Sequence, residues 1–266
     1  MPRRFLLISF VFILLFVSCT EVPLTGRRQL RLLPDGLLLN MSMQAFNDFM
    51  SQNPSLPPDN PKSVMVQQSG ERIANAVTAY LQEINMERRI RNFAWEFKVV
   101  LNEDVNAWVM PGGKVVFYTG IFPLAKDENG IAVVMGHEIA HAVANHGNER
   151  MSQQLAVVLG AITLDVALRE KPQETRDVFL LAYGVGGTLG TLAYSRQHEY
   201  EADKLGMIFM AMAGYNPNHA IRFWDEMTKL KGPSIPTFLS THPSSADRVE
   251  AMREFLPEAM KYYKPR

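Results

Sequence analysis

Residues 137–141 read His-Glu-Ile-Ala-His, and this stretch decides which fold the chain adopts. Two histidines four positions apart project from one face of a helix, with Cβ atoms about 5–6 Å apart, so both imidazoles can bind one metal ion. The glutamate after the first histidine can reach a water molecule on that metal. The pattern is typical of zinc hydrolases, with His137 and His141 as ligands and Glu138 as the general base.

The sequence around this stretch predicts a helix from Glu128 to His146. Apolar side chains recur there at helical spacing, namely Ile131, Val134, Met135, Ile139 and Val143. Asp127 is a plausible N-cap, and no proline interrupts the pattern. The alternative is a buried helix whose two motif histidines make ordinary hydrogen bonds. Three further histidines are expected to have no role at the metal: His146, which would point away from the metal-binding face, His198 and His219.

A catalytic zinc site needs a third protein ligand and keeps a fourth position for water. One known solution, a histidine six residues after the second motif histidine, is excluded because residue 147 is glycine. The other solution is a glutamate on a later helix. Glu199 and Asp203 lie four residues apart, so Glu199 could bind zinc while Asp203 supports a ligand histidine. The alternative is an acidic helix face that is exposed to solvent.

Four motifs in this order resemble the gluzincin metallopeptidases, which include the CAAX-prenyl endopeptidases, the heat-shock protease HtpX and the mitochondrial Oma proteases. The motifs are Asn106-Ala107 with Pro111-Gly112-Gly113, His137 to His141, Ser195-Arg196 with Glu199 and Ala202-Asp203, and Thr241-His242-Pro243-Ser244. The resemblance runs from about Gln29 to Phe255 and is strongest to the soluble periplasmic lipoprotein branch that contains the β-barrel assembly-enhancing protease. It implies a mainly α-helical α+β fold, a zincin-like domain with a small antiparallel sheet beside the active-site helix.

The resemblance also implies roles for single residues. Glu199, rather than Glu201, matches the third zinc ligand, and Asp203 matches the residue that supports a histidine. A histidine at the place of His242 lies near the metal in this family, and in some members it takes the fourth coordination position and keeps the enzyme latent. Arg248 matches an arginine near the active site. The alternative for His242 is an ordinary loop histidine.

The residues before the motif helix predict a small sheet. Residues 94–100 alternate in polarity and are rich in strand formers, and further strands are expected at Asn106–Met110 and Lys114–Tyr118. A turn at Pro111-Gly112-Gly113 would join the last two. In zincins of this kind an edge strand borders the cleft and pairs with an extended substrate. We assign substrate binding to the first of these two strands, through Asn106, Ala107 and Trp108; an ordinary hairpin is the alternative.

The N-terminus predicts an export signal. Arg3 and Arg4 precede an uncharged apolar run, Phe5–Val17, which is too short for a comfortable membrane span. Cys19, the only cysteine of the chain, follows the small residue Ser18 in a sequence that resembles a bacterial lipobox. We therefore expect lipidation of Cys19 after cleavage. An ordinary signal peptide with an incidental cysteine is the alternative.

These features predict a domain organisation and a location. The expected parts are a lipoprotein signal peptide over 1–18, a lipidated tether over 19–40 and a zinc metallopeptidase domain over 41–266. Threonine rather than aspartate at position 20 favours the outer membrane of a bacterial envelope, facing the periplasm. The 27 basic and 27 acidic residues balance, so nucleic acid is an unlikely partner. A single cysteine excludes an intrachain disulfide.

Two apolar stretches follow the motif helix, at 155–168 and 178–195. The second carries no charged residue and reaches the lower length limit of a membrane span. Its glycines favour a buried or cleft-covering helix, with a membrane span as the alternative. Amphipathic helices are expected at 218–229 and 245–260, on either side of the loop that carries His242.

The motifs together predict a zinc-dependent endopeptidase with one Zn²⁺ per chain. A zinc ion lowers the pKa of bound water to about 7, and Glu138 would accept the proton and pass it to the leaving amine. The expected substrates are misfolded or unassembled envelope proteins. The alternatives are a latent zinc-bearing chaperone or assembly factor of the outer membrane, and a structural lipoprotein whose motif is accidental.

Overall fold

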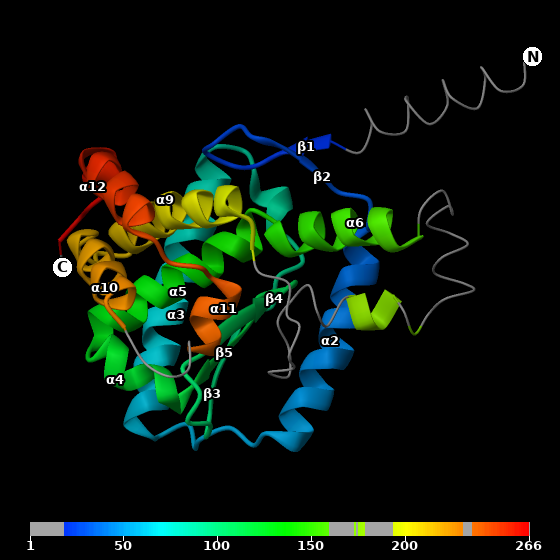
Figure 1. The fold of residues 1–266 in the computed structure, drawn as a ribbon, viewed down its shortest axis with the longest axis horizontal. Helices are drawn as coiled ribbons and strands as arrows, with labels where there is room; N and C mark the ends of the chain where they lie inside the picture. Colours follow the sequence, from blue (N-terminus) through cyan, green and yellow to red (C-terminus); the bar gives the residue numbers. More distant parts are fainter. Residues whose placement is uncertain (1–18, 160–172, 174, 179–193, 231–235, 266) are drawn as a thin grey trace, which may run out of the picture.

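The computed structural model describes most of the chain. The residues outside this description are 1–18, 160–172, 174, 179–193, 231–235 and 266. The expected signal peptide and most of the apolar stretch 178–195 therefore lie outside the described residues, as does the later part of 155–168. Helices dominate the described part, and the predicted α+β class is confirmed (Figure 1).

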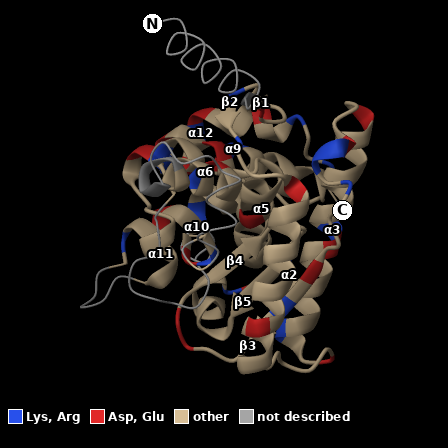
Figure 2. Cartoon of the chain, turned by 90° about the vertical axis from the view of Figure 1, so that its right-hand side faces the viewer, with Lys and Arg blue, Asp and Glu red and all other residues tan. Residues whose placement is uncertain are grey.

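Two strands open the described part of the chain, and three further strands form a second small sheet between the N-terminal and the later helices. The described elements are β1 (Cys19–Glu21), β2 (Arg28–Leu30), α2 (Asp35–Gln52), α3 (Pro61–Glu83), η1 (Glu87–Arg89), β3 (Glu96–Val100), β4 (Ala107–Met110), β5 (Lys114–Tyr118), η2 (Thr119–Ile121), α4 (Phe122–Ala125), α5 (Glu128–Val143), α6 (His146–Leu159), α9 (Arg196–Met212), α10 (Asn218–Thr228), α11 (Thr237–Thr241) and α12 (Ala246–Met260). Among the described helices, none combines the length and the apolar composition that crossing a bilayer requires. Figure 2 shows acidic and basic residues interspersed along these elements, in keeping with the balanced charge of the sequence.

The sheet has three strands in the order β3–β5–β4, so β4 lies at an edge as expected. β4 and β5 form an antiparallel hairpin, and its turn uses φ angles of +84° at Gly112 and +83° at Gly113, which glycine adopts readily. The predicted small antiparallel sheet is confirmed for this hairpin. β3 differs, because β5 lies between β3 and β4 and pairs with β3 in parallel.

The two faces of the sheet contact different helices. Side chains alternate along β4, so Ala107 and Val109 pack into the core built by α3, α5 and α9. Trp108 and Met110 point to the opposite face, into a second cluster that includes Phe49 of α2. The sheet is therefore enclosed between α2 on one side and the motif helix α5 on the other.

Helices α5 and α9, which carry the expected ligands, touch backbone to backbone. A Cβ atom added to Gly206 would lie 3.0 Å from the backbone nitrogen of His137, and one added to Gly136 would lie 2.9 Å from the carbonyl oxygen of Gly206. Real Cβ atoms rarely approach so closely. The glycine pair therefore allows the two helices to cross at the level of the first motif histidine.

The predicted continuous helix through His146 is wrong. Helix α5 ends at Val143, the backbone reverses at Asn145 with φ +56°, and α6 begins at His146. Asparagine is one of the few non-glycine residues that adopts this left-handed conformation readily. The break turns the chain, so the side chain of His146 returns toward α5 instead of pointing away from it.

The N-terminal residues after Cys19 pack onto the helices. β1 and β2 form a two-stranded antiparallel hairpin with Cys19 opposite Leu30. Gln29 is buried and donates a hydrogen bond of 2.7 Å to the carbonyl oxygen of Ala144, at the break between α5 and α6. The expected tether is thus a structured part of the fold along this hairpin, and Leu33 beyond it is buried as well.

Candidate metal centre

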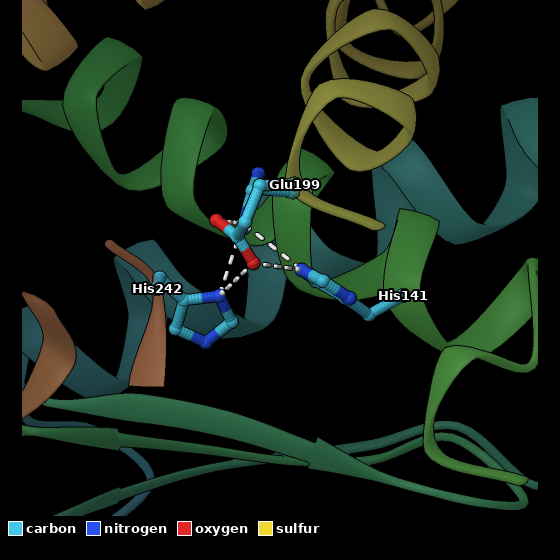
Figure 3. Close-up of side chains that lie close together, drawn as sticks. His141, Glu199 and His242 are labelled. Atoms are coloured by element: carbon cyan, nitrogen blue, oxygen red, sulfur yellow. Dashed lines mark hydrogen bonds and ion pairs between the residues drawn. The ribbon is translucent and has the colours of Figure 1, made fainter. Parts of the chain in front are cut away.

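Four buried side chains converge beside the sheet. His137 and His141 extend from α5, Glu199 from the first turn of α9, and His242 from the loop after α11. One donor atom from each of the four lies within 4.8 Å of the others, and Figure 3 shows three of them in contact. Side chains from three separate parts of the chain therefore bring their donor atoms to one possible metal-binding position.

The donor atoms are spaced as a tetrahedral zinc ion requires. Zinc–nitrogen and zinc–oxygen bonds of about 2.0–2.1 Å place neighbouring ligand atoms about 3.3 Å apart. The Nε2 atoms of His137 and His141 are 3.1 Å apart, and they lie 3.5 and 3.4 Å from the two oxygens of Glu199. His242 Nδ1 lies 3.2 Å from His137 Nε2 and 3.1 Å from Glu199 Oε1. Two imidazoles, a carboxylate and a further imidazole at this spacing fit Zn²⁺.

Glu138 lies beside the donors and is not one of them. Its side chain is buried, and its Oε1 atom has no hydrogen-bond partner among the described residues. His242 Nε2 lies 3.4 Å from this oxygen. Burial raises the pKa of Glu138 to about 8, and a divalent cation beside it would favour the carboxylate form. A carboxylate with an unsatisfied oxygen at this point can accept a proton from water.

Asp203 and Arg248 hold the donors in place. Asp203 Oδ1 lies 3.2 Å from Nδ1 of His137, which leaves the Nε2 atom of His137 for the metal. Arg248 donates to both oxygens of Asp203 at 2.7 and 2.6 Å, and its Nη1 atom lies 2.7 Å from Glu199 Oε2. Burial alone would raise the pKa of Glu199, but His242 and Arg248 hold it well below its ordinary value. Arg248 therefore contacts the ligand carboxylate and the supporting carboxylate together.

The edge strand β4 borders the same centre. A small cleft is lined by Asn106, Ala107, Trp108, Val109, Glu138, Arg150, Tyr194, Thr241 and His242. Asn106 is buried, and its Oδ1 atom has no hydrogen-bond partner among the described residues. The ring of Trp108 instead packs edge-on against Phe49, with centroids 5.0 Å apart, on the far face of the sheet. The ring of Trp108 therefore lies away from the metal centre, and its backbone groups pair with Val116 of β5, so the substrate-binding role expected for Trp108 stays a prediction.

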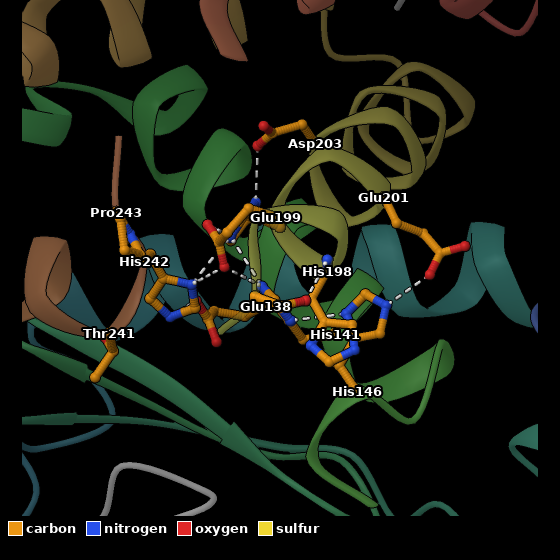
Figure 4. A network of polar contacts seen from close by, with 12 residues as sticks. Glu138, His141, His146, His198, Glu199, Glu201, Asp203, Thr241, His242 and Pro243 are labelled. Atoms are coloured by element: carbon orange, nitrogen blue, oxygen red, sulfur yellow. Dashed lines mark hydrogen bonds and ion pairs between the residues drawn. The ribbon is translucent and has the colours of Figure 1, made fainter. Parts of the chain in front are cut away.

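A second buried network lies behind His141, and sequence reasoning missed it (Figure 4). His146, expected to be remote, has its Nδ1 atom 2.9 Å from Nδ1 of His141. Its other nitrogen lies 2.9 Å from Glu201, and burial lowers the pKa of His146 to about 4. His198 stacks on His146 at a centroid distance of 4.6 Å. Extra histidines and glutamates close to both motifs in the sequence were a signal that could have indicated this network. Which of them pair could not be predicted, because the pairing depends on the break at Asn145.

The sequence matches a known family over most of its length. A family model described as "Peptidase family M48" matches residues 66–256, which include every donor described above. The match therefore extends well beyond the pentapeptide, from within α3 to within α12.

Several known proteins are similar to the chain. It is 33% identical over 252 residues to "Mitochondrial metalloendopeptidase OMA1" of Schizosaccharomyces pombe, a match that covers 92% of this chain and 68% of that protein. A "Putative beta-barrel assembly-enhancing protease" of Vibrio cholerae is 31% identical over 59% of this chain and 34% of its own length. "Metalloprotease YcaL" of Escherichia coli is 26% identical over 70% of this chain and 69% of its own length. The chain therefore spans only part of each of these relatives.

Proposed function

The chain belongs to peptidase family M48 and is a zinc metalloendopeptidase, and from that premise we propose that it cleaves misfolded or unassembled envelope proteins while anchored through a lipidated Cys19. One observation carries the assignment of its active site. His137, His141 and Glu199 offer donor atoms at zinc spacing, and Glu138 lies next to them with a free oxygen. A peptidase of this kind needs these groups and a strand that aligns the peptide.

The residues around the centre divide the chemistry between them. When bound, zinc supplies Lewis acidity, which lowers the pKa of water and favours negative charge on a carbonyl oxygen. Glu138 accepts the proton of the attacking water and returns it to the leaving amine. Asp203 orients His137. Arg248 fixes the positions of Asp203 and Glu199 through the hydrogen bonds and the ion pair described above.

The edge of β4 that pairs with no other described strand aligns the substrate. Tyr118 N donates to the carbonyl oxygen of Asn106 at 3.0 Å, so in this antiparallel pair the backbone groups of Ala107 and Val109 face outward. The carbonyl oxygen of Val105, which has the same outward direction, already accepts a hydrogen bond of 2.9 Å from Phe238 N. An extended peptide can therefore continue this pairing next to Glu138.

His242 favours a second candidate function, a latent zinc-bearing chaperone or assembly factor. A catalytic zinc centre keeps one position for water, and here the fourth donor position is taken by His242 Nδ1. We propose that this arrangement is a resting form and that cleavage requires His242 to leave. A protein that stays in this form would bind unfolded partners along β4 without hydrolysing them.

The location and the substrate class rest on two further observations. Cys19 follows the lipobox-like sequence and is the first residue of β1. A lipid on this residue would therefore keep the hairpin and the metal centre near a membrane surface. A similar protein bears the name of a β-barrel assembly-enhancing protease, which supports unassembled outer-membrane proteins as substrates.

Zinc content and proteolysis of the purified full chain test the proposal together. We expect one zinc per chain and cleavage of casein and of an unfolded β-barrel protein, abolished by a chelator and restored by zinc. Zinc without cleavage, even after substitution of His242, would support the chaperone. Absence of zinc would refute both readings. Mass spectrometry of the mature N-terminus, with a Cys19→Ala control, tests the lipid anchor.

A further inference from the structure

The two ring nitrogens of His141 face different neighbours. Nε2 belongs to the donor set, and Nδ1 lies 2.9 Å from Nδ1 of His146. A neutral imidazole carries one proton, so a His141 that binds zinc through Nε2 must carry its proton on Nδ1 and donate it. His146 must then accept through Nδ1, which places its own proton on Nε2. That nitrogen lies 2.9 Å from Glu201 Oε2, a carboxylate that accepts it.

The two zinc-binding histidines are therefore supported in different ways. His137 reaches a carboxylate directly, through Asp203 at 3.2 Å. His141 reaches a carboxylate only through a second imidazole, that of His146. Both His146 and Glu201 are buried, with 0% and 6% of their surface exposed, so water cannot substitute for either group without a rearrangement.

The N-terminal hairpin fixes the far end of this chain of hydrogen bonds. The hydroxyl of Thr25 donates to Glu201 Oε1, and Nε of Arg27 donates to Glu201 Oε2 at 2.8 Å. The remaining guanidinium nitrogens of Arg27 donate to both oxygens of Glu149 at 2.9 and 2.7 Å. Thr25 and Arg27 lie in the connection between β1 and β2, so a segment 174 residues before Glu201 holds its carboxylate.

We propose that His146 and Glu201 are positioning residues that orient His141 for the metal, and that Thr25 and Arg27 of the N-terminal hairpin hold Glu201 in place. This inference rests on the proposed zinc site and adds to it residues outside its donor set. It makes the hairpin part of the metal centre, because only two side chains, Glu201 and His146, separate Arg27 from a ligand. A hairpin that is displaced would loosen His141 while leaving the other donors in place.

Zinc affinity of the full chain tests this inference without relying on proteolysis. His146→Leu removes the acceptor for His141, whereas His146→Asn keeps an oxygen near the position of Nδ1. His219→Leu is the control, because His219 lies on α10 outside this network, where its ring contacts Arg222. Substitution of groups that support metal ligands typically weakens metal binding by about 10–100-fold. We expect a loss of this size for His146→Leu, a smaller loss for His146→Asn and none for His219→Leu.

A spectroscopic readout separates positioning from simple stability. Cobalt(II) in the zinc site reports ligand geometry through its visible absorption, so the band should change in His146→Leu and recover in His146→Asn. Zinc affinity and a cobalt spectrum equal to those of the wild type in His146→Leu, even if its thermal stability is lower, would show a purely structural network. Failure of the wild-type chain to bind zinc would instead refute the zinc site itself.

The hairpin provides a second test that does not depend on the folding of core variants. Arg27→Leu should weaken zinc binding, whereas Arg28→Leu, its exposed neighbour in the same hairpin, should not. Equal zinc affinities for the two arginine variants would overturn the role of the hairpin.

Discussion

The Nδ1 atom of His242 lies 3.2 Å from the Nε2 atom of His137, so a loop histidine shares the metal position with the motif helix. Its side chain is 2% exposed, and the ring of Phe238 packs against it with centroids 4.7 Å apart. In the proposed resting form, this ring takes the position that an attacking water molecule needs. Under this proposal, the equilibrium between bound His242 and bound water determines what fraction of the protein can hydrolyse substrate.

His242→Ala should raise proteolysis and leave zinc bound, since His137, His141 and Glu199 remain. We expect kcat for casein to rise about tenfold, the change that a bias of about 1.4 kcal/mol toward the closed arrangement would produce. Zinc content and initial rates measure the two effects, and His219→Ala serves as the control. A fall in kcat with zinc retained would assign His242 a part in the reaction itself.

Glu138→Gln should keep zinc and lose cleavage, because the amide retains the shape of the side chain but cannot accept the proton. General base catalysis contributes about 10²–10⁴-fold to the rate, so kcat should fall at least about 100-fold. Metal analysis and a fluorogenic peptide assay provide the measurement. The exposed Glu254→Gln variant controls for loss of a negative charge. Unchanged proteolysis would remove Glu138 from the mechanism.

Glu199→Gln should lose the stabilisation that zinc provides. The amide is a poor zinc ligand, but it can still accept a hydrogen bond from Arg248, so the fold is expected to survive. Zinc at a hundred times its dissociation constant stabilises a native protein by about 2.7 kcal/mol. The wild-type Tm should therefore rise on zinc addition and fall with chelator, while the variant responds to neither. A zinc-dependent Tm in the variant would contradict the ligand assignment.

Val109→Pro should weaken substrate binding without displacing the metal. The substitution removes an N–H that faces outward from β4, a position that tolerates proline in an edge strand. One hydrogen bond contributes about 0.5–1.5 kcal/mol, so kcat/KM for an extended peptide should fall about two- to twelvefold. Val109→Ala loses most of the same side chain but keeps the N–H. Equal kcat/KM values for the two variants would argue against pairing along this edge.

Glu149→Gln should alter the pH dependence of stability. Burial alone would raise the pKa of Glu149, but hydrogen bonds from His198 and Arg27 hold it well below its ordinary value of 4.5. A depressed folded-state pKa stabilises the protein above the unfolded-state value, and this contribution is lost as the pH falls below about 4.5. The variant should therefore be less stable than the wild type at pH 6.5, by about 1–3 kcal/mol.

Urea unfolding of the metal-free protein in chelator measures this difference. The gap between wild type and Glu149→Gln should narrow from pH 6.5 to pH 3.5, because only the wild type loses the contribution of the carboxylate. A gap of equal size at both pH values would mean that Glu149 titrates in the folded protein as it does in the unfolded chain.

Local patterns in the sequence predict much of the fold and of the donor set. The four-residue spacing of His137 and His141 requires only one helix, and the helix is present. The turn at Pro111-Gly112-Gly113 likewise produces the hairpin that places β4 at the edge. Such features were predictable because neighbouring residues along the chain determine them.

The second network could not be predicted, because it depends on contacts between distant segments. A single left-handed residue, Asn145, turns His146 back toward α5, and a continuous helix would have sent it elsewhere. Glu199 and Glu201 belong to one acidic stretch of the sequence. In the structure, Glu199 lies among the donors, whereas Glu201 binds His146 and Arg27. No spacing rule links residue 27 to residue 201.

The contact between Gly136 and Gly206 has a consequence for the choice of ion. The crossing point sets how near the imidazole pair of one helix comes to the carboxylate of the other, and therefore the bond lengths that the centre can offer. A methyl group on either residue would push the two helices apart and lengthen the distances between the donor atoms. Longer distances suit larger cations such as cadmium. Alanine at either position should therefore weaken zinc binding relative to cadmium binding, which competition between the two ions would measure.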